Sequence, residues 1–233
     1  GTACSPTGGV PVTLTSDGTI SGLADLDLAS QQVNVTGSVF NAAQADVGPS
    51  DIVLANQRVS GTASAALSIT NTDISPAGFQ EGLNAAIGAT SGDAPGAGGP
   101  IVNLEQGFGD SSSLTVGVDT GTAGLKSGAV TVDLTSNGTI SGVADLALDA
   151  QQVNVAGSVF QVAEGQLNTT PLNFGVVQVG QLVTQDLSIS NIATGTAGFV
   201  EDLNVRFGAT SGAGAGLISG TGQIDGLFAG MSG

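Results

Sequence analysis

A long internal repeat is the feature of this sequence that most constrains its fold. Residues 11–40 match residues 131–160 at 22 of 30 positions without a gap, at an offset of 120 residues. The ten-residue segments QQVNVTGSVF, at 31–40, and QQVNVAGSVF, at 151–160, differ at a single position. A period of this length indicates duplicated domains, because solenoid repeats have periods of roughly 20–50 residues. We therefore expect two tandem units within the 233 residues.

Short runs with apolar residues at alternate positions predict β-strands along the whole chain. Val10, Val12 and Leu14 alternate with polar residues or proline and precede an Asp-Gly turn, and Val33 and Val35 alternate in the same way. This period of two is typical of a strand with one buried face. Further strands are expected at 52–59, 66–71, 83–90, 172–179, 182–191, 203–209 and 217–220, with a loop or mobile connection at 93–100. The pattern predicts an all-β sandwich in each unit.

The charge balance excludes several classes of partner. The chain has three Lys and Arg residues against 19 Asp and Glu residues, for a net charge of −16. Nucleic acids and anionic membrane surfaces are bound through Lys and Arg, so neither is an expected partner. No apolar stretch approaches the length of about 20 residues that a membrane-spanning helix needs. We therefore expect no nucleic-acid binding and no insertion into a membrane.

Residues that carry catalysis or bind metals are scarce. Histidine is absent, which excludes a Ser-His-Asp triad and a histidine-bearing zinc site. Cys4 is the single cysteine, so no disulfide forms within the chain. Carboxylate pairs occur, but the chain has no Trp or Tyr to stack on a sugar as glycosidases do. We predict that the protein is not an enzyme and has no cofactor, and loop carboxylates leave Ca²⁺ open as an alternative.

One segment resembles a known family of domains. Residues 171–191, PLNFGVVQVGQLVTQDLSISN, are similar to the F-G-x-V-x-V-G and L-x-I-x-N strands of Hydin-like (ASH-type) immunoglobulin domains. Residues 113–139 and 197–204 resemble bacterial choice-of-anchor D proteins, which are secreted or surface proteins built from such units. The resemblance implies immunoglobulin-like β-sandwiches, an extracellular or bacterial cell-surface location, and a binding or scaffolding role. It supplies no catalytic residues.

In that family a unit begins and ends at different points than the two copies of the repeat do in this chain. Residues 44–160 correspond to one complete unit, residues 1–43 to the closing strands of a unit, and residues 161–233 to the opening strands of a unit. Two full periods would take 240 residues, and the difference corresponds to residues 114–120. We therefore expect one unit to be split between the two terminal segments.

A half-sandwich exposes an apolar face and unpaired strand edges, which soluble proteins avoid. We hypothesise that the N-terminal strands of one molecule complete the C-terminal half of the next. The donor residues would be Val10, Val12, Leu14, Val33 and Val35, and the acceptor residues Phe174, Val177, Val179, Leu187 and Ile189. Two alternatives remain open: the same strands fold back within one chain, or the sequence is a piece of a longer array.

The sequence thus predicts a secreted structural subunit that polymerises head to tail, with itself as its partner. A contact of this kind joins two different surfaces and propagates as a filament or layer. The alternative is a monomeric extracellular binding or adhesin module whose loops recognise a surface glycan or protein.

Overall fold

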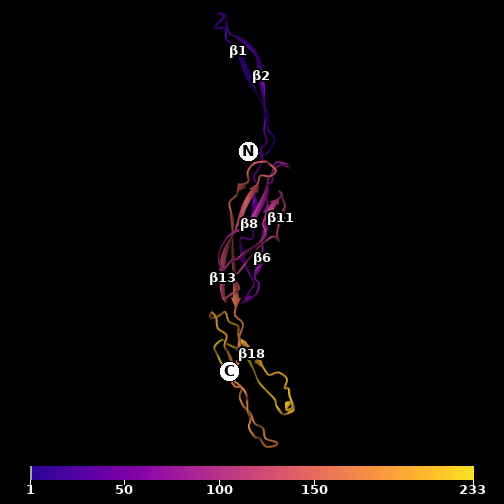
Figure 1. The fold of residues 1–233 in the computed structure, drawn as a ribbon, viewed down its shortest axis with the longest axis vertical. Coiled ribbons are helices and arrows are strands. Elements are labelled where there is room, and N and C mark those ends of the chain that lie inside the picture. The colour runs from indigo at the N-terminus through magenta and orange to yellow at the C-terminus, as the bar shows by residue number, and fades with distance from the viewer. Residues whose placement is uncertain (1) are drawn as a thin grey trace.

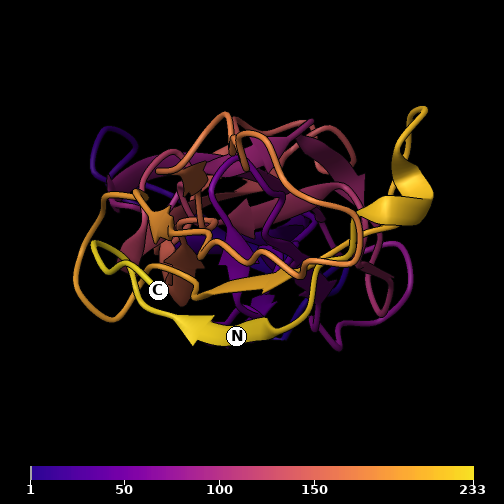
Figure 2. The same cartoon turned by 90° about the horizontal axis from the view of Figure 1, so that it is seen from below.

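The computed structural model describes residues 2–233 and confirms the predicted all-β fold. Nineteen strands and one turn of 3-10 helix make up the regular structure of these residues. The molecule is long and narrow, with an N-terminal hairpin, a central β-sandwich and a C-terminal segment following one another along its long axis (Figure 1). Seen from the C-terminal end, the three parts project over one another (Figure 2).

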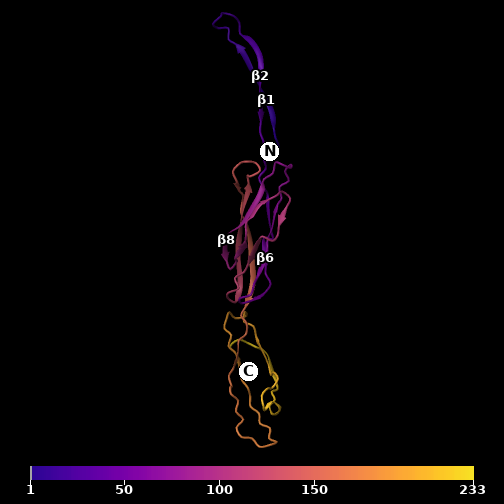
Figure 3. The same ribbon diagram turned by 45° about the vertical axis from the view of Figure 1, so that its right-hand side comes forward.

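The N-terminal hairpin stands apart from the rest of the protein. Its strands are β1 (Thr7–Ser16) and β2 (Leu26–Thr36), which pair antiparallel as a separate two-stranded sheet. A bridge between Cys4 and Val39 closes its base. The hairpin projects beyond the end of the sandwich in both side views (Figures 1 and 3). A two-stranded hairpin alone in water is only marginally stable.

The larger sheet of the central sandwich is built around one long hairpin. The strand order is β10-β8-β13-β15-β4, with β14 beside β13 and β5 beside β15. β15 pairs parallel with β4 and β5, and the other pairs are antiparallel. The bounds are β4 (Asp51–Val53), β5 (Gln57–Arg58), β8 (Gly82–Gly92), β10 (Ile101–Leu104), β13 (Gly124–Asn137), β14 (Leu146–Ala147) and β15 (Gln151–Phe160).

Two three-stranded sheets complete the sandwich. Their strand orders are β11-β7-β3 and β6-β12-β9. The bounds are β3 (Ala45–Gly48), β6 (Ser64–Ala66), β7 (Ser68–Asn71), β9 (Gly96–Gly98), β11 (Gly109–Asp110) and β12 (Leu114–Gly117). The core between the layers is made of Val, Ile, Leu and Ala side chains, among them Ile52, Leu67, Ile69, Leu83, Leu114, Val116, Val130, Val132, Leu134, Val153 and Val155.

The C-terminal segment contains four strands, but not all of them lie where the sequence predicts. It has β16 (Gly165–Leu167), β17 (Ile189–Asn191), β18 (Leu203–Arg206) and β19 (Gln223–Leu227), with a 3-10 turn at Ala215–Leu217. The predicted strand at 172–179 does not form, the one at 182–191 is reduced to β17, and the one at 217–220 is wrong.

The predicted loop at 93–100 is also wrong, because this stretch contains the short strand β9, which pairs with β12. Its glycines give no hydrophobic alternation, so the sequence pattern carries no strand signal there. Gly98 has a φ of 125° and its Cα faces the backbone of Ser113 so closely that a Cβ would lie 2.0 Å from the Ser113 carbonyl oxygen. The strand therefore depends on residues that lack side chains.

Candidate functional site

The hairpin β1–β2 presents an apolar face to solvent. Val10, Val33 and Val35 each expose more than half of their surface, Val12 exposes 39%, and Leu14 is half-buried. All five are the predicted donor residues. In the register of the hairpin Val10 lies opposite Val33, so these side chains line one face of the sheet.

The same hairpin occurs inside the central sandwich, with its apolar face covered. β13 and β15 pair in the same register at the offset of 120, with Val130 opposite Val153. The counterparts of the five donor residues are identical in type and belong to the core: Val130, Val132, Leu134, Val153 and Val155, each at most 3% exposed. The structure therefore contains one sequence pattern in two environments, buried in the sandwich and open to solvent at the N-terminal end.

The C-terminal segment reproduces the strand pairs that residues 41–110 make among themselves. β16 pairs with β17 as β3 pairs with β7, in the same register. β18 pairs with β19 as β8 pairs with β10, after a shift of three residues in the outer strand. The amide of Asn191 donates to the Leu227 carbonyl at 3.0 Å, as the amide of Asn71 donates to that of Leu104 at 3.1 Å.

The pairs with no counterpart in the C-terminal segment are those that join residues 41–110 to residues 114–160. In the sandwich, β4 and β5 pair with β15, and β6 pairs with β12. The corresponding residues 172–188 have no pairing strand within residues 2–233 and stay irregular. This explains the failed strand prediction at 172–179, because an isolated extended segment leaves its backbone groups without hydrogen-bond partners.

The predicted acceptor residues are not gathered into one surface. Ile189 is buried at 7% exposure and Leu187 is half-buried, because both lie next to or within the formed strand β17. Phe174 and Val177 are exposed at 40% and 51%, and Val179 is fully exposed. The hairpin and the C-terminal segment lie at opposite ends of the molecule (Figure 1), so donor and acceptor residues do not meet in this structure.

Three further apolar residues of the C-terminal segment correspond to core positions of the central sandwich and were not singled out from the sequence. Leu172, Leu203 and Val205 are the counterparts of the core residues Ile52, Leu83 and Ala85, which are at most 8% exposed. Leu172 is 37% exposed, and Leu203 and Val205 are half-buried. They could have been found by adding 120 to the number of every apolar residue in the predicted strands, instead of using only the residues of the family motif.

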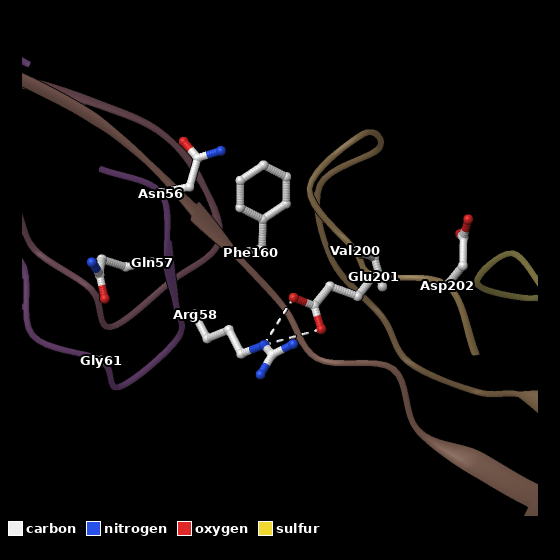
Figure 4. Close-up of a pocket in the computed structure, with 8 residues that line it drawn as sticks. All are labelled: Asn56, Gln57, Arg58, Gly61, Phe160, Val200, Glu201 and Asp202. Carbon is white, nitrogen blue, oxygen red and sulfur yellow. Dashed lines mark hydrogen bonds and ion pairs between the residues drawn. The ribbon is translucent and has the colours of Figure 1, made fainter. Parts of the chain in front are cut away.

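A shallow groove lies where the central sandwich meets the C-terminal segment (Figure 4). Arg58 and Glu201 form an ion pair across it, with the Arg58 Nε 2.8 Å from Glu201 Oε1 and 3.1 Å from Oε2. The hydrogen bond to Glu201, and then its negative charge, raise the pKa of the Arg58 guanidinium above its ordinary value. The groove is lined by Asn56, Gln57, Arg58, Gly61, Phe160, Val200, Glu201 and Asp202. It is wide and open, and we assign it no small-molecule ligand.

Other kinds of site find little support. Within residues 2–233, no group of three or more acidic or cysteine side chains is close enough to hold a metal ion, so no residues are assigned to calcium. Cys4 is exposed and not in a disulfide. The part of the chain that the structure describes contains no helix with the length and hydropathy of a membrane span.

Comparison with solved structures finds 12 matching chains. The structure is similar to the ASH/PapD-like domain of human CEP192 (PapD-like domain 7), with 9% sequence identity and a TM-score of 0.34, over 52% of this chain and 87% of that chain. No protein-family model matches the sequence. No curated protein matches it at the significance required. The assignment to the β-sandwich class therefore depends on the observed strands and core.

Proposed function

We propose that the protein is a structural subunit that assembles head to tail, with the hairpin β1–β2 of one molecule inserting into the C-terminal half-sandwich of another. The observation that carries this proposal is the occurrence of the same five apolar residues in both hairpins. In β13 and β15 they are buried in the core, and in β1 and β2 they are open to solvent. The packing of β13 and β15 in the central sandwich is thus the pattern for the contact that the free hairpin would make with an acceptor.

The central sandwich also supplies the expected pairing between subunits. Leu134 of β13 lies opposite Ala85 of β8, so Leu14 is expected to lie opposite Val205 of the neighbouring subunit. On the other side of the hairpin, Val155 of β15 pairs parallel with Ile52. Val35 is therefore expected to pair with Leu172, within the segment that is irregular in the free molecule.

Burial of the donor side chains supplies part of the free energy of this contact. Fully burying a Val or Leu side chain stabilises by about 1.5–3 kcal/mol. The five donor side chains have already lost about half of their exposure, so they would contribute roughly 5 kcal/mol in total. Association costs at least ~4 kcal/mol of translational and rotational freedom. Backbone hydrogen bonds on both edges of the hairpin must therefore add to apolar burial for a stable joint.

We place this assembly outside the cell, as a filament or layer at a bacterial surface. Support comes from the resemblance to choice-of-anchor D proteins and Hydin-like immunoglobulin domains, and from the low content of charged residues, 9%, which lets neighbouring molecules pack without desolvating many charges. The partner is a second copy of the chain, and neither nucleic acid nor a cofactor has a role in the proposed mechanism.

The test compares two substitutions on neighbouring residues of β1. Val12→Asp puts a charge on the apolar face and is expected to leave the protein monomeric. Thr13→Asp puts the same charge on the opposite face, at the position where the central sandwich has the exposed Asp133, and is expected to assemble like the wild type. Assembly is measured by light scattering after size exclusion and by negative-stain electron microscopy.

The outcomes separate the proposal from its alternatives. Both substitutions lie outside the central sandwich, so its thermal unfolding serves as the control for folding. Deletion of residues 1–16 should abolish assembly as Val12→Asp does. A wild-type protein that remains a 22.4 kDa monomer at high concentration, or a Val12→Asp variant that still forms filaments, would contradict the proposal. The monomeric result would favour the binding-module alternative.

A further inference from the structure

A buried carboxylate lies at the turn end of the hairpin in the central sandwich. Glu81 is 4% exposed, and its two oxygens accept hydrogen bonds from the hydroxyls of Ser136 and Ser141, the first at 2.6 Å. The Ser136 hydroxyl oxygen in turn accepts from the backbone N–H of Ala43 at 2.8 Å. Ser136 is the penultimate residue of β13, and Ser141 lies in the following turn. Both hydrogen bonds to the carboxylate thus come from the hairpin, and neither donor is a basic side chain.

This arrangement makes the hairpin position specific. A carboxylate that loses water must receive hydrogen bonds from the groups around it, or its burial is strongly unfavourable. A shift of the hairpin by one residue would turn the Ser136 hydroxyl to the opposite face of the sheet and leave Glu81 without that donor. The apolar side chains of β13 all resemble one another, whereas the two hydroxyls define a single register.

The same residues recur in the open unit, at the offset of 120. Ser16 and Ser21 stand on the free hairpin, where Ser16 is exposed and the Ser21 hydroxyl donates to the Gly18 carbonyl. Glu201 stands in the C-terminal segment, held by the same backbone contact: its N–H donates to the Gln161 carbonyl, as the Glu81 N–H donates to that of Asn41. Both halves of the carboxylate site are thus present, and they lie on the donor and the acceptor.

We infer that Glu201 is the specificity-determining residue of the acceptor, and that it accepts hydrogen bonds from Ser16 and Ser21 of the incoming hairpin. This inference rests on the proposed head-to-tail assembly. In the free molecule Glu201 is one-third exposed and pairs with Arg58, whose side chain is 67% exposed. Docking would exchange this ion pair for two hydroxyl donors and bury the carboxylate as Glu81 is buried.

The exchange is feasible because the ion pair is weakly held. An exposed ion pair contributes little to stability, since water solvates both partners well and salt screens them. Arg58 is therefore expected to be dispensable for assembly. The offset of 120 places Gln178 at the position of Arg58, so Arg58→Gln introduces the residue that the chain already has at the equivalent place.

The test is a mutant cycle in the full chain, with the critical concentration for assembly as the readout. We expect the double variant Ser16→Ala/Ser21→Ala to raise the critical concentration at least tenfold, and Glu201→Ala to raise it as well. Combining the three changes should cost much less than the product of the separate effects, because the same hydrogen bonds are lost. Arg58→Gln should change the critical concentration less than threefold.

The serine variants make the result decisive, because both residues lie on the hairpin and cannot unfold the acceptor. An unchanged critical concentration in the double serine variant would overturn the inference, and so would effects of Ser16/Ser21 and Glu201 that multiply independently. A tenfold loss in Arg58→Gln would show that the ion pair is part of the joint and would also overturn it. Failure of the wild type to assemble would instead refute the proposed function.

Discussion

Asp17 is the residue at which the free hairpin departs most clearly from its buried copy. Its counterpart Asn137 is 8% exposed, donates to the Asn84 side chain at 3.3 Å, and lies opposite Gly82. In a docked hairpin Asp17 would lie opposite Asp202, and two carboxylates would face each other. In the free hairpin the Thr19 hydroxyl, and then its backbone N–H, lower the pKa of Asp17, so this carboxyl group is ionised at neutral pH.

We predict that Asp17→Asn strengthens assembly. The substitution restores the amide of the central sandwich and removes the repulsion from Asp202, so the critical concentration at pH 7 should fall several-fold. The facing Asp202 carboxylate should raise the pKa of Asp17 in the docked state above its value in the free hairpin, so acidification is expected to favour assembly. The advantage of Asp17→Asn should therefore shrink as the pH falls toward 3.8, the ordinary value for aspartate. A critical concentration equal to that of the wild type at pH 7 would contradict this reading.

Asp110 gives the central sandwich its own dependence on pH. The backbone N–H groups of Ser112 and Ser113, and then the Ser113 hydroxyl, donate to its carboxylate and lower its pKa. A lowered pKa contributes stability above the ordinary value of 3.8 that is lost as the pH falls through the folded-state value.

We therefore expect Asp110→Asn to reduce the free energy of unfolding by about 0.5–1.5 kcal/mol at pH 7. The difference from the wild type should vanish once the pH is well below 3.8, because the wild-type carboxyl group is then protonated. Thermal unfolding across this pH range checks the prediction, with the variant and the wild type compared at each pH. A deficit that stays constant into acid would assign the effect to geometry rather than charge.

At the scale of the element, the sequence pattern predicts the long strands and misses several of the short ones, among them β9. β1, β2 and β8 form where the sequence predicts strands, and β13 and β15 repeat the apolar alternation of β1 and β2 at the offset of 120. The stretch 172–179 is also rich in apolar residues but forms no strand. Its copy in the sandwich pairs with β15, and the C-terminal segment has no strand that corresponds to β15. Pairing decided the outcome there, and pairing is a non-local property. For the same reason the sequence did not single out Leu203 and Val205. They correspond to Leu83 and Ala85, whose place in the core is seen only in the fold.

The irregular segment should become a strand when the acceptor is filled. In the sandwich the N–H of Leu54 donates to the Ala156 carbonyl at 2.8 Å, and that of Val59 to the Phe160 carbonyl at 2.9 Å. The corresponding amides are those of Phe174 and Val179. We predict that both exchange hydrogen rapidly in the monomeric Val12→Asp variant and slowly in the assembly.

Ile189 provides the internal control for this measurement. Its N–H already donates to the Gly233 carbonyl at 3.0 Å, so its exchange should change much less between the two states. Hydrogen exchange followed by mass spectrometry on peptides covering 170–191 would distinguish these amides. Slow exchange at Phe174 and Val179 in the monomer would mean that the strand forms without a donor.

At the scale of the whole molecule, the two connections between a hairpin and the following unit have similar geometry. The rings of Phe40 and Phe79 lie 5.6 Å apart at 47°, and those of Phe160 and Phe199 lie 5.4 Å apart at 40°. Parallel bridges also recur, from Asn41 to Gln80 and from Gln161 to Val200. The first joint follows the free hairpin and the second follows the buried one. The connection between the free hairpin and the central sandwich therefore already has the form seen after a buried hairpin, and insertion of the hairpin would not need to change it.

This equivalence predicts the repeat of the filament. A docked hairpin sits in its acceptor as β13 and β15 sit in the central sandwich, and the connection that follows is the same. The rotation and translation that relate one sandwich unit to the next should then be the same within a chain and between chains. Electron micrographs should show an axial repeat of one sandwich unit, half the length that each chain adds. A dominant repeat of two units would mean that the joint between molecules differs from the joint within them, so that the hairpin enters its acceptor in another register or at another angle.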